Sequence, residues 1–293
     1  MLEYYTLNEA LEQFKYLKEK GFVLPTKESL EQKQFAQISA ILQNSQTVKS
    51  RQFDAIETRH DFREVAGQAL YLFSPFKSKR LNHTIKNILS DNLVKVSQKI
   101  SPNISCVRYD EKDNHAQDIV IAPVQSDVQS ISLASAIASI LKNTNPEEYQ
   151  NHYIDEKVIP YFLEEMFSQK LSRESAGNAS LQEATALARI MHTINASKVY
   201  EELNEAYEQG FPADQYRAWI LYVSNIYRDL YGMVEALKLY KKYQENQFVV
   251  LKAVKEVLSG QKTTSMILQE LELNTYQEVD LVKEKCQSLR LIP

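Results

Sequence analysis

Glycine and proline are scarce in this chain, with only 6 glycines and 8 prolines among 293 residues. A fold of many β-strands needs turn residues about every ten positions, and these two residues are the usual ones. Their scarcity favours long helices. The sequence therefore predicts a predominantly α-helical (α+β) fold, which is a helical body with one small β-hairpin or sheet element.

Apolar residues recur at helical spacing over most of the chain. Thr6 and Glu9, for example, form a capping box ahead of the first apolar stripe, because each side chain can bond the free backbone N–H of the other. The expected helices cover, approximately, residues 6–21, 26–42, 58–73, 81–101, 127–142, 154–170, 180–194, 212–244 and 246–260, and two short helices follow.

One region has a different pattern, at 103–124. Ile104–Tyr109 and Asp118–Ala122 are rich in β-branched residues, and the polar run Asp110–Gln117 separates them. Two such runs around a polar loop predict a hairpin or a pair of neighbouring strands. No repeat of fixed period and no low-complexity linker interrupts the chain, so we expect a single compact domain over 1–293.

The net charge of −4 gives no reason to expect nucleic acid as a partner, because nucleic-acid binding normally requires a basic face. No run approaches 18 apolar residues, so no membrane span is expected. Met1–Tyr5 opens no signal peptide, and Cys106 and Cys286 lie far apart without metal-ligand spacing. The sequence thus predicts a cytoplasmic protein with reduced thiols.

Metal and cofactor motifs are missing from the sequence. The five histidines form no H-E-x-x-H, and there is no glycine-rich phosphate-binding motif. His60 and Glu64 share one helix face, and His152 is a distant further ligand candidate. A histidine with carboxylates at a helix start is more often ordinary solvated surface. We therefore expect neither a metal nor a cofactor.

Two other clusters have both a functional and a structural interpretation. The basic residues between Lys77 and Lys86 could contact an acidic partner or a phosphate, or form a solvated helix face. Aromatic residues in the 216–243 segment could line a peptide-binding groove, or pack at the edge of a helical core. The groove candidates are Tyr216, Trp219, Tyr222 and Tyr227.

The β-prone run Asp118–Val124, followed by Ile131–Leu141, resembles the strand and active-site helix of gluzincin metallopeptidases. In that superfamily the helix carries H-E-x-x-H, and a later helix supplies a glutamate as third zinc ligand. Tyr153–Phe167 resembles this later helix. The resemblance implies a gluzincin-like fold, with Glu156, Glu164 and Glu165 as candidates for the third-ligand position.

The C-terminal third resembles the oligopeptidase F and thimet-oligopeptidase group. There, a tyrosine-rich helix is followed by an L-x-x-G segment and a short helical tail, which Val257–Gly260 and Ser265–Leu268 resemble. The resemblance covers roughly residues 103–293. It implies a subdivision into an N-terminal helical region, 1–100, and a degenerate metallopeptidase-like region, 103–293.

The chain departs from the family at the chemically essential positions. The resemblance places Ser135-Ala136-Ile137-Ala138-Ser139 at H-E-x-x-H, with serines at the two histidine positions. A hydroxyl is a poor zinc ligand beside an imidazole, and Ala136 cannot take a proton from an attacking water. Such a site would not catalyse zinc-assisted amide hydrolysis. The alternative is that these small residues merely let a neighbouring helix pack closely.

The resemblance implies a non-catalytic metallopeptidase-like protein that binds a peptide or protein. The alternative is a helical scaffold or interaction protein with no peptidase ancestry, which a structure without a strand beside 127–142 would favour. A third hypothesis, a hydrolase with ligands such as His60, Glu64 and His152, has no positive support in the sequence.

Overall fold

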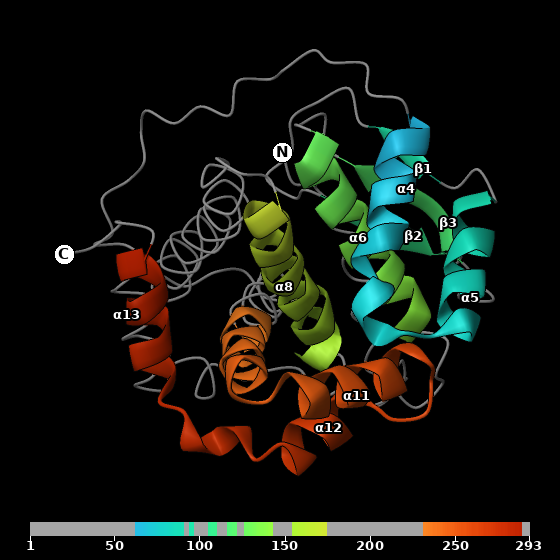
Figure 1. The fold of residues 1–293 in the computed structure, drawn as a ribbon. Coiled ribbons are helices and arrows are strands. Elements are labelled where there is room, and N and C mark those ends of the chain that lie inside the picture. The colour runs from blue at the N-terminus through green and yellow to red at the C-terminus, as the bar shows by residue number, and fades with distance from the viewer. Residues whose placement is uncertain are drawn as a thin grey trace, which may run out of the picture.

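The structure is a computed structural model, shown in Figure 1. It describes the following residues: 62–90, 94–96, 105–109, 116–121, 126–142, 154–174 and 231–288. Within these ranges the chain is predominantly helical, as the sequence predicts. No helix in the described ranges is both long and apolar enough to cross a membrane.

The first part of the described chain contains two helices, three strands and a long central helix. In chain order these are α4 (Phe62–Leu72), the 3₁₀ turn η1 (Ser74–Phe76), α5 (Lys79–Ser90), β1 (Val94–Val96), β2 (Ser105–Tyr109), β3 (Ala116–Ile121) and α6 (Ser126–Lys142). The second part is helical throughout. It contains η2 (Ile154–Lys157), α8 (Val158–Glu174), a helix over 231–245, α11 (Gln247–Leu258), α12 (Thr264–Glu270), η3 (Leu273–Thr275) and α13 (Glu278–Ser288).

Several expected helices are confirmed close to their expected bounds. The expected helix 58–73 corresponds to α4, 127–142 to α6, and 246–260 to α11. Gly260, with φ of 69°, follows the end of α11 in the left-handed conformation that glycine adopts without strain. The expected helices 6–21, 26–42 and 180–194, and residues 212–230, lie outside the described residues.

The expected helix that carries Leu81 to Val96 and stops before Pro102 is wrong at its C-terminal end. Helix α5 stops at Ser90, and Val96 belongs to strand β1, which pairs in parallel with β3 through Val94 opposite Ile119. Asp91 and Asn92 follow α5 in the sequence, and such side chains compete with helical backbone hydrogen bonds. Pairing with β3 instead gives the backbone of residues 94–96 its hydrogen-bond partners. Val94 and Val96 are β-branched, and such residues are better suited to a strand than to a helix.

The three strands form one sheet in the order β1-β3-β2. Strand β2 pairs antiparallel with β3, with Cys106 opposite Val120, and the register shifts between Arg108 and Tyr109. Helix α6 follows β3 in the chain and packs on β2 and β3. Figure 1 shows α6 and α4 side by side next to this sheet.

Helix α6 occupies the centre of the described fold. It contacts α4, α8, α11 and two strands, and every residue from 130 to 138 is buried. A helix surrounded in this way is expected to be apolar or small on all sides. Its serines and alanines fit this position, because small side chains let neighbouring backbones approach closely. Ser130 also donates a hydrogen bond to the Gln68 side chain of α4, at 2.8 Å.

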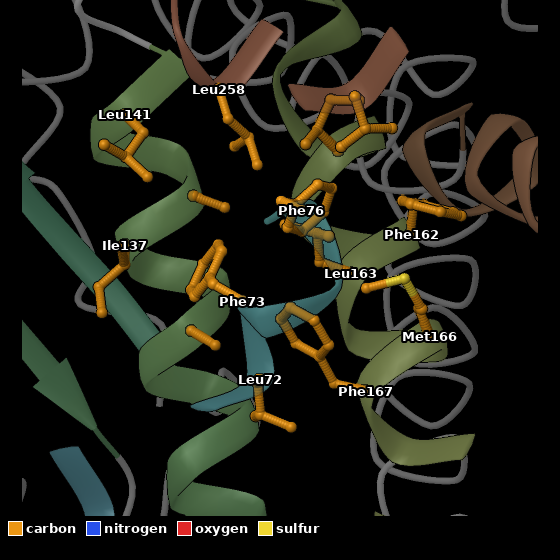
Figure 2. Close-up of a cluster of buried hydrophobic side chains, with 14 of the residues drawn as sticks. Leu72, Phe73, Phe76, Ile137, Leu141, Phe162, Leu163, Met166, Phe167 and Leu258 are labelled. Atoms are coloured by element: carbon orange, nitrogen blue, oxygen red, sulfur yellow. The ribbon is translucent and has the colours of Figure 1, made fainter. Parts of the chain in front are cut away.

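The main hydrophobic core lies between α4, η1, α6, α8 and α11 (Figure 2). Phe73 and Phe167 meet edge to face, with ring centroids 5.4 Å apart and planes at 70°, a preferred arrangement for aromatic pairs. Ile137 of α6 and Leu258 of α11 belong to the same cluster. This core fixes α6 against α8, so the residues at their contact are held by packing.

Two glycines give opposite predictions for substitution by alanine. A Cβ at Gly232 would lie 2.5 Å from the Cβ of Lys157, whereas a Cβ at Gly67 in α4 meets nothing within 4 Å. We expect Gly232→Ala to lower the free energy of unfolding by about 1–3 kcal/mol, because the 231–245 helix must move away from η2. We expect Gly67→Ala to raise it by about 0.5–1 kcal/mol, through helix propensity.

Urea denaturation of both variants, followed by circular dichroism, measures these changes. Each variant is the control for the other, since both add one methyl group to a helical glycine. Equal effects in the two variants would show that the close contact between Gly232 and Lys157 does not constrain the fold.

Candidate functional site

Two residues that the sequence analysis assigned to the degenerate metal site meet at the contact between α6 and α8. The Ser135 hydroxyl donates a hydrogen bond to Oε1 of Glu164 at 2.6 Å. Both side chains are buried, with exposures of 4% and 8%. In the resemblance, Ser135 stands at the first histidine position and Glu164 is one of the three candidates for the third-ligand position. We name this pair the Ser135–Glu164 contact.

The other two positions of the degenerate motif carry a serine and an alanine, Ser139 and Ala136. Ser139 shares a face of α6 with Ser135, because the two are four residues apart. Its hydroxyl donates to the backbone carbonyl of Ser135 at 3.3 Å, a bond within its own helix. Ala136 is 2% exposed and carries no group that could accept a proton.

The three glutamates that the sequence left as candidates for the third-ligand position are separated by the structure. Glu164 turns toward α6, whereas Glu165, the next residue of α8, turns toward α13 and pairs with Lys285 at 2.5 Å. Glu156 lies one element earlier, half-buried in η2. Among the three, Glu164 is therefore the one that contacts a serine of the degenerate motif.

Several other candidates lie outside the described residues. These are the groove residues Tyr216, Trp219, Tyr222 and Tyr227, and the histidines His60 and His152. Glu64 is described, and it lies exposed in the first turn of α4. Across the described ranges, no three His, Cys, Asp or Glu side chains gather closely enough to hold a metal ion.

A buried ion-pair cluster links the 231–245 helix to α13, and no sequence motif predicted it. Lys238, in the 231–245 helix, contacts Glu235 at 2.6 Å and Glu278 of α13 at 2.7 Å. Lys238 is only 3% exposed, and Glu235 7%. The chain thus holds a charged amine in the interior by placing two carboxylates against it, which is the usual condition for burying such a group.

Burial and charge shift the pKa values of this cluster. Desolvation raises the pKa of Glu235 above its ordinary value, and outweighs the hydrogen bond and charge of Lys238, which lower it. Desolvation alone would lower the pKa of Lys238, but the hydrogen bonds and charges of Glu235 and Glu278 together raise it. Lys238 is therefore a firmly protonated ammonium between two carboxylates.

Helix α13 is attached to the rest of the fold through charges as well as apolar contacts. Besides Lys238–Glu278 and Lys285–Glu165, it pairs Glu284 with Lys241 at 3.1 Å. The partners in these three pairs are 40, 43 and 120 positions apart in the sequence. Local spacing cannot predict pairs at such separations. The only signal in the sequence is the lysines and glutamates themselves, which are common on any helix.

The buried thiol of Cys286 in α13 gives a prediction for alkaline pH. Burial raises the pKa of Cys286 from 9.0 to about 11, against the opposing charge of Lys285. A raised pKa in the folded state contributes stability that is complete below pH 9 and is lost as the pH rises through about 11. We expect this loss to amount to about 2–3 kcal/mol.

Urea denaturation at several pH values between 9 and 11 tests this, with Cys286→Ala as the comparison. The unfolding free energy of the variant should fall less steeply over this interval, because its unfolded state has lost one thiol that ionises. The other cysteine, Cys106, is present in both proteins and contributes equally. Parallel curves for the two proteins would contradict the prediction.

Comparison of the chain with known protein families, with curated proteins and with solved structures finds no match in any of the three.

Proposed function

We propose that this chain is a non-catalytic metallopeptidase-like protein that binds a peptide or a protein segment without cleaving it. In this proposal, α6 and α8 occupy the places of the two metal-binding helices of a gluzincin. The Ser135–Glu164 contact stands where a gluzincin would hold its zinc ion.

The arrangement of elements around α6 supports the proposal. Strand β3 comes directly before α6 in the chain, and α6 packs on both β2 and β3. Helix α8 follows and packs against α6. This is the order of strand, active-site helix and glutamate-bearing helix that the resemblance implies.

The single observation that carries the proposal is the 2.6 Å hydrogen bond between Ser135 and Glu164. The buried residue that the resemblance puts at the first histidine position of α6 thus reaches a glutamate of α8. A third zinc ligand must approach the first in the same way, because one ion binds both at about 2 Å. With serine in place of histidine, the same approach gives a hydrogen bond.

The chemistry of these residues supports the absence of catalysis. Zinc peptidases need three protein ligands for the ion and a group that takes a proton from water. Ser135 and Ser139 are weak ligands for zinc, and both hydroxyls already donate to oxygen atoms. Ala136 supplies no base. Binding without hydrolysis is the remaining activity for a peptide-binding fold of this kind.

The tryptophan of the predicted groove allows a direct test, because Trp219 is the only tryptophan in the chain. The full chain would be mixed with a library of short peptides that contain no tryptophan. We expect peptides to be retained with the protein on a size-exclusion column and to shift the emission of Trp219. Mass spectrometry of the retained peptides should find only intact masses, with and without added zinc.

Two matched variants show whether the predicted groove is responsible. Tyr222→Ala should reduce peptide retention, whereas Tyr71→Ala removes an exposed tyrosine of α4, 49% exposed, and should leave it unchanged. Peptide cleavage, or equal retention by both variants and the parent, would contradict the proposal. So would the absence of any retained peptide.

The second candidate function is a helical scaffold with no peptidase ancestry. One observation favours it: every residue from 130 to 138 is buried, so the small side chains of α6 serve close packing whatever their origin. Packing alone would explain serines and alanines at these positions. It does not require that positions 135, 139 and 164 be arranged as metal ligands, so rebuilding the ligands separates the two candidates.

A further inference from the structure

We propose that the exposed face of α5 is a docking surface for an acidic segment of a protein partner. We name it the α5 basic face and define it by Lys79, Arg80, His83 and Lys86, together with Lys77 just before the helix. The surface belongs to other elements than the Ser135–Glu164 contact, and the inference does not depend on the proposed peptide-binding function.

The charge of this region is opposite to that of the whole chain. From residue 65 to residue 90 there is no Asp or Glu, although the chain contains 38 acidic residues. The same stretch contains four permanent positive charges, at Lys77, Lys79, Arg80 and Lys86. The local net charge is therefore +4 in a chain whose net charge is −4.

The structure gathers these charges on one side of α5. Lys79, His83 and Lys86 are exposed and follow the i, i+4, i+7 spacing of a single helix face. Leu81 and Ile85, which point the opposite way, are buried in the core. From Lys79 to Lys86 the stripe is about 10 Å long, at about 1.5 Å per residue. Arg80 lies exposed at its side.

The side chains of the α5 basic face have no hydrogen-bond or ion-pair partner within the described residues. None of the five makes a side-chain hydrogen bond or an ion pair in the described part of the fold. By contrast, Lys238, Lys262 and Lys285 each contact a carboxylate at 2.7 Å or less. Within the described ranges, the α5 basic face therefore has no counter-charge in contact with it, and we infer that an acidic partner supplies one.

The observations favour an acidic protein segment over nucleic acid or a membrane. A nucleic acid presents negative charge over a length much greater than this stripe, and the net charge of −4 opposes its approach. Membrane-surface helices insert large apolar side chains beside their basic residues. Of the exposed large apolar residues in the described ranges, none lies on α5. A short acidic segment meets only the local positive charge.

The spacing of the stripe defines the partner further. A helix with Glu or Asp at i, i+4 and i+7 places its carboxylates at the same intervals as Lys79, His83 and Lys86. Such a helix can lie along α5 with each carboxylate near one basic side chain. The probe for a test is therefore a fluorescein-labelled helical peptide with glutamates at these positions, and its control is the same peptide with glutamines.

The test compares two triple variants of the full chain that remove the same charge. K79Q/R80Q/K86Q removes three charges from the α5 basic face. K252Q/K255Q/K283Q removes three from lysines of α11 and α13 that also make no ion pair within the described ranges. Both variants have a net charge of −7, which is −4 less three. Lys255 is half-buried and the other five substituted side chains are exposed, so we expect both variants to keep the fold, and circular dichroism checks this.

Fluorescence anisotropy at low ionic strength should show saturable binding of the glutamate peptide to the parent protein. We expect K79Q/R80Q/K86Q to weaken this binding about tenfold and K252Q/K255Q/K283Q to change it less than about twofold. Salt at about 0.5 M should abolish it.

Three results would overturn the inference. The first is equal weakening in the two variants, which would make net charge the cause. The second is a failure of the glutamate peptide to bind the parent protein more tightly than the glutamine peptide does, which includes no binding at all. The third is tighter binding of a single-stranded DNA oligomer, or of vesicles containing phosphatidylserine, than of the glutamate peptide.

Discussion

Replacing Lys238 with methionine is expected to lower the free energy of unfolding by about 3–5 kcal/mol. The substitution removes the only positive charge that the structure places against both Glu235 and Glu278, at 2.6 and 2.7 Å, within the described residues. Methionine fills most of the volume, so the lost energy arises from the buried carboxylate of Glu235 and the half-buried one of Glu278, which are left without a counter-charge. Removing one partner of a buried ion pair destabilises the folded state by more than the intact pair stabilises it.

The pH dependence of the variant gives a second measurement of the same cause. Without Lys238, desolvation and the nearby negative charges of Glu278 and Asp155 all raise the pKa of Glu235. Protonation of Glu235 relieves the unfavourable burial of its charge. The deficit of the variant should therefore be largest at neutral pH and should shrink as the pH falls through the raised pKa of Glu235.

Lys241→Met is the matched control, on the same helix and with the same side-chain change. Lys241 pairs with Glu284 at 3.1 Å, but the two side chains are 40% and 59% exposed. Exposed pairs contribute little, so this variant should lose less than about 1 kcal/mol. Urea denaturation measures both. Similar losses in the two variants would show that burial of the Lys238 cluster has no energetic consequence.

Replacing Phe167 with alanine is expected to lower the free energy of unfolding by about 3–5 kcal/mol. Phe167 is fully buried, and its ring packs edge to face on Phe73 at 5.4 Å (Figure 2). The change removes the apolar area of a ring and leaves a cavity between α4 and α8. The surrounding helices can close this cavity only in part, because they are also fixed against α6.

Phe248→Ala provides the control for this substitution. Phe248 lies near the start of α11 and is 78% exposed. The same loss of a ring should there change the free energy of unfolding by less than about 0.5 kcal/mol. Thermal or urea unfolding of the two variants separates the loss of core packing from the effect of losing a phenylalanine ring anywhere in the chain. A loss below about 1 kcal/mol for Phe167→Ala would contradict the packing described here.

The helices of the described chain could largely be predicted from local patterns. Helix formation depends on residues a few positions apart, so apolar periodicity and stop residues such as Gly260 located α4, α6 and α11. The prediction failed where a distant partner decided the structure. Val96 fits the apolar spacing of the helix expected before it. Residues 94–96 nevertheless form a strand, because they pair with β3, 25 residues further along the chain.

The candidate site was predictable only in part, for the same reason. The resemblance named Ser135, yet it left Glu156, Glu164 and Glu165 open as candidates for the third-ligand position. That choice depends on how α8 is rotated between α6 and α13, which tertiary packing determines. The charged attachment of α13 was not predictable, because Lys285 and Glu165 are separated by 120 positions.

The proposed function makes positions 135, 139 and 164 the ligand positions of a lost zinc site. Its most direct test restores the two histidines, as S135H/S139H, and measures bound zinc by plasma mass spectrometry after purification without a histidine tag. We expect about one zinc per chain in this variant and at least about tenfold weaker binding when E164Q is added. A folded S135H/S139H protein that binds no zinc, or that binds it equally well with E164Q, would contradict the proposed function and favour a helical scaffold.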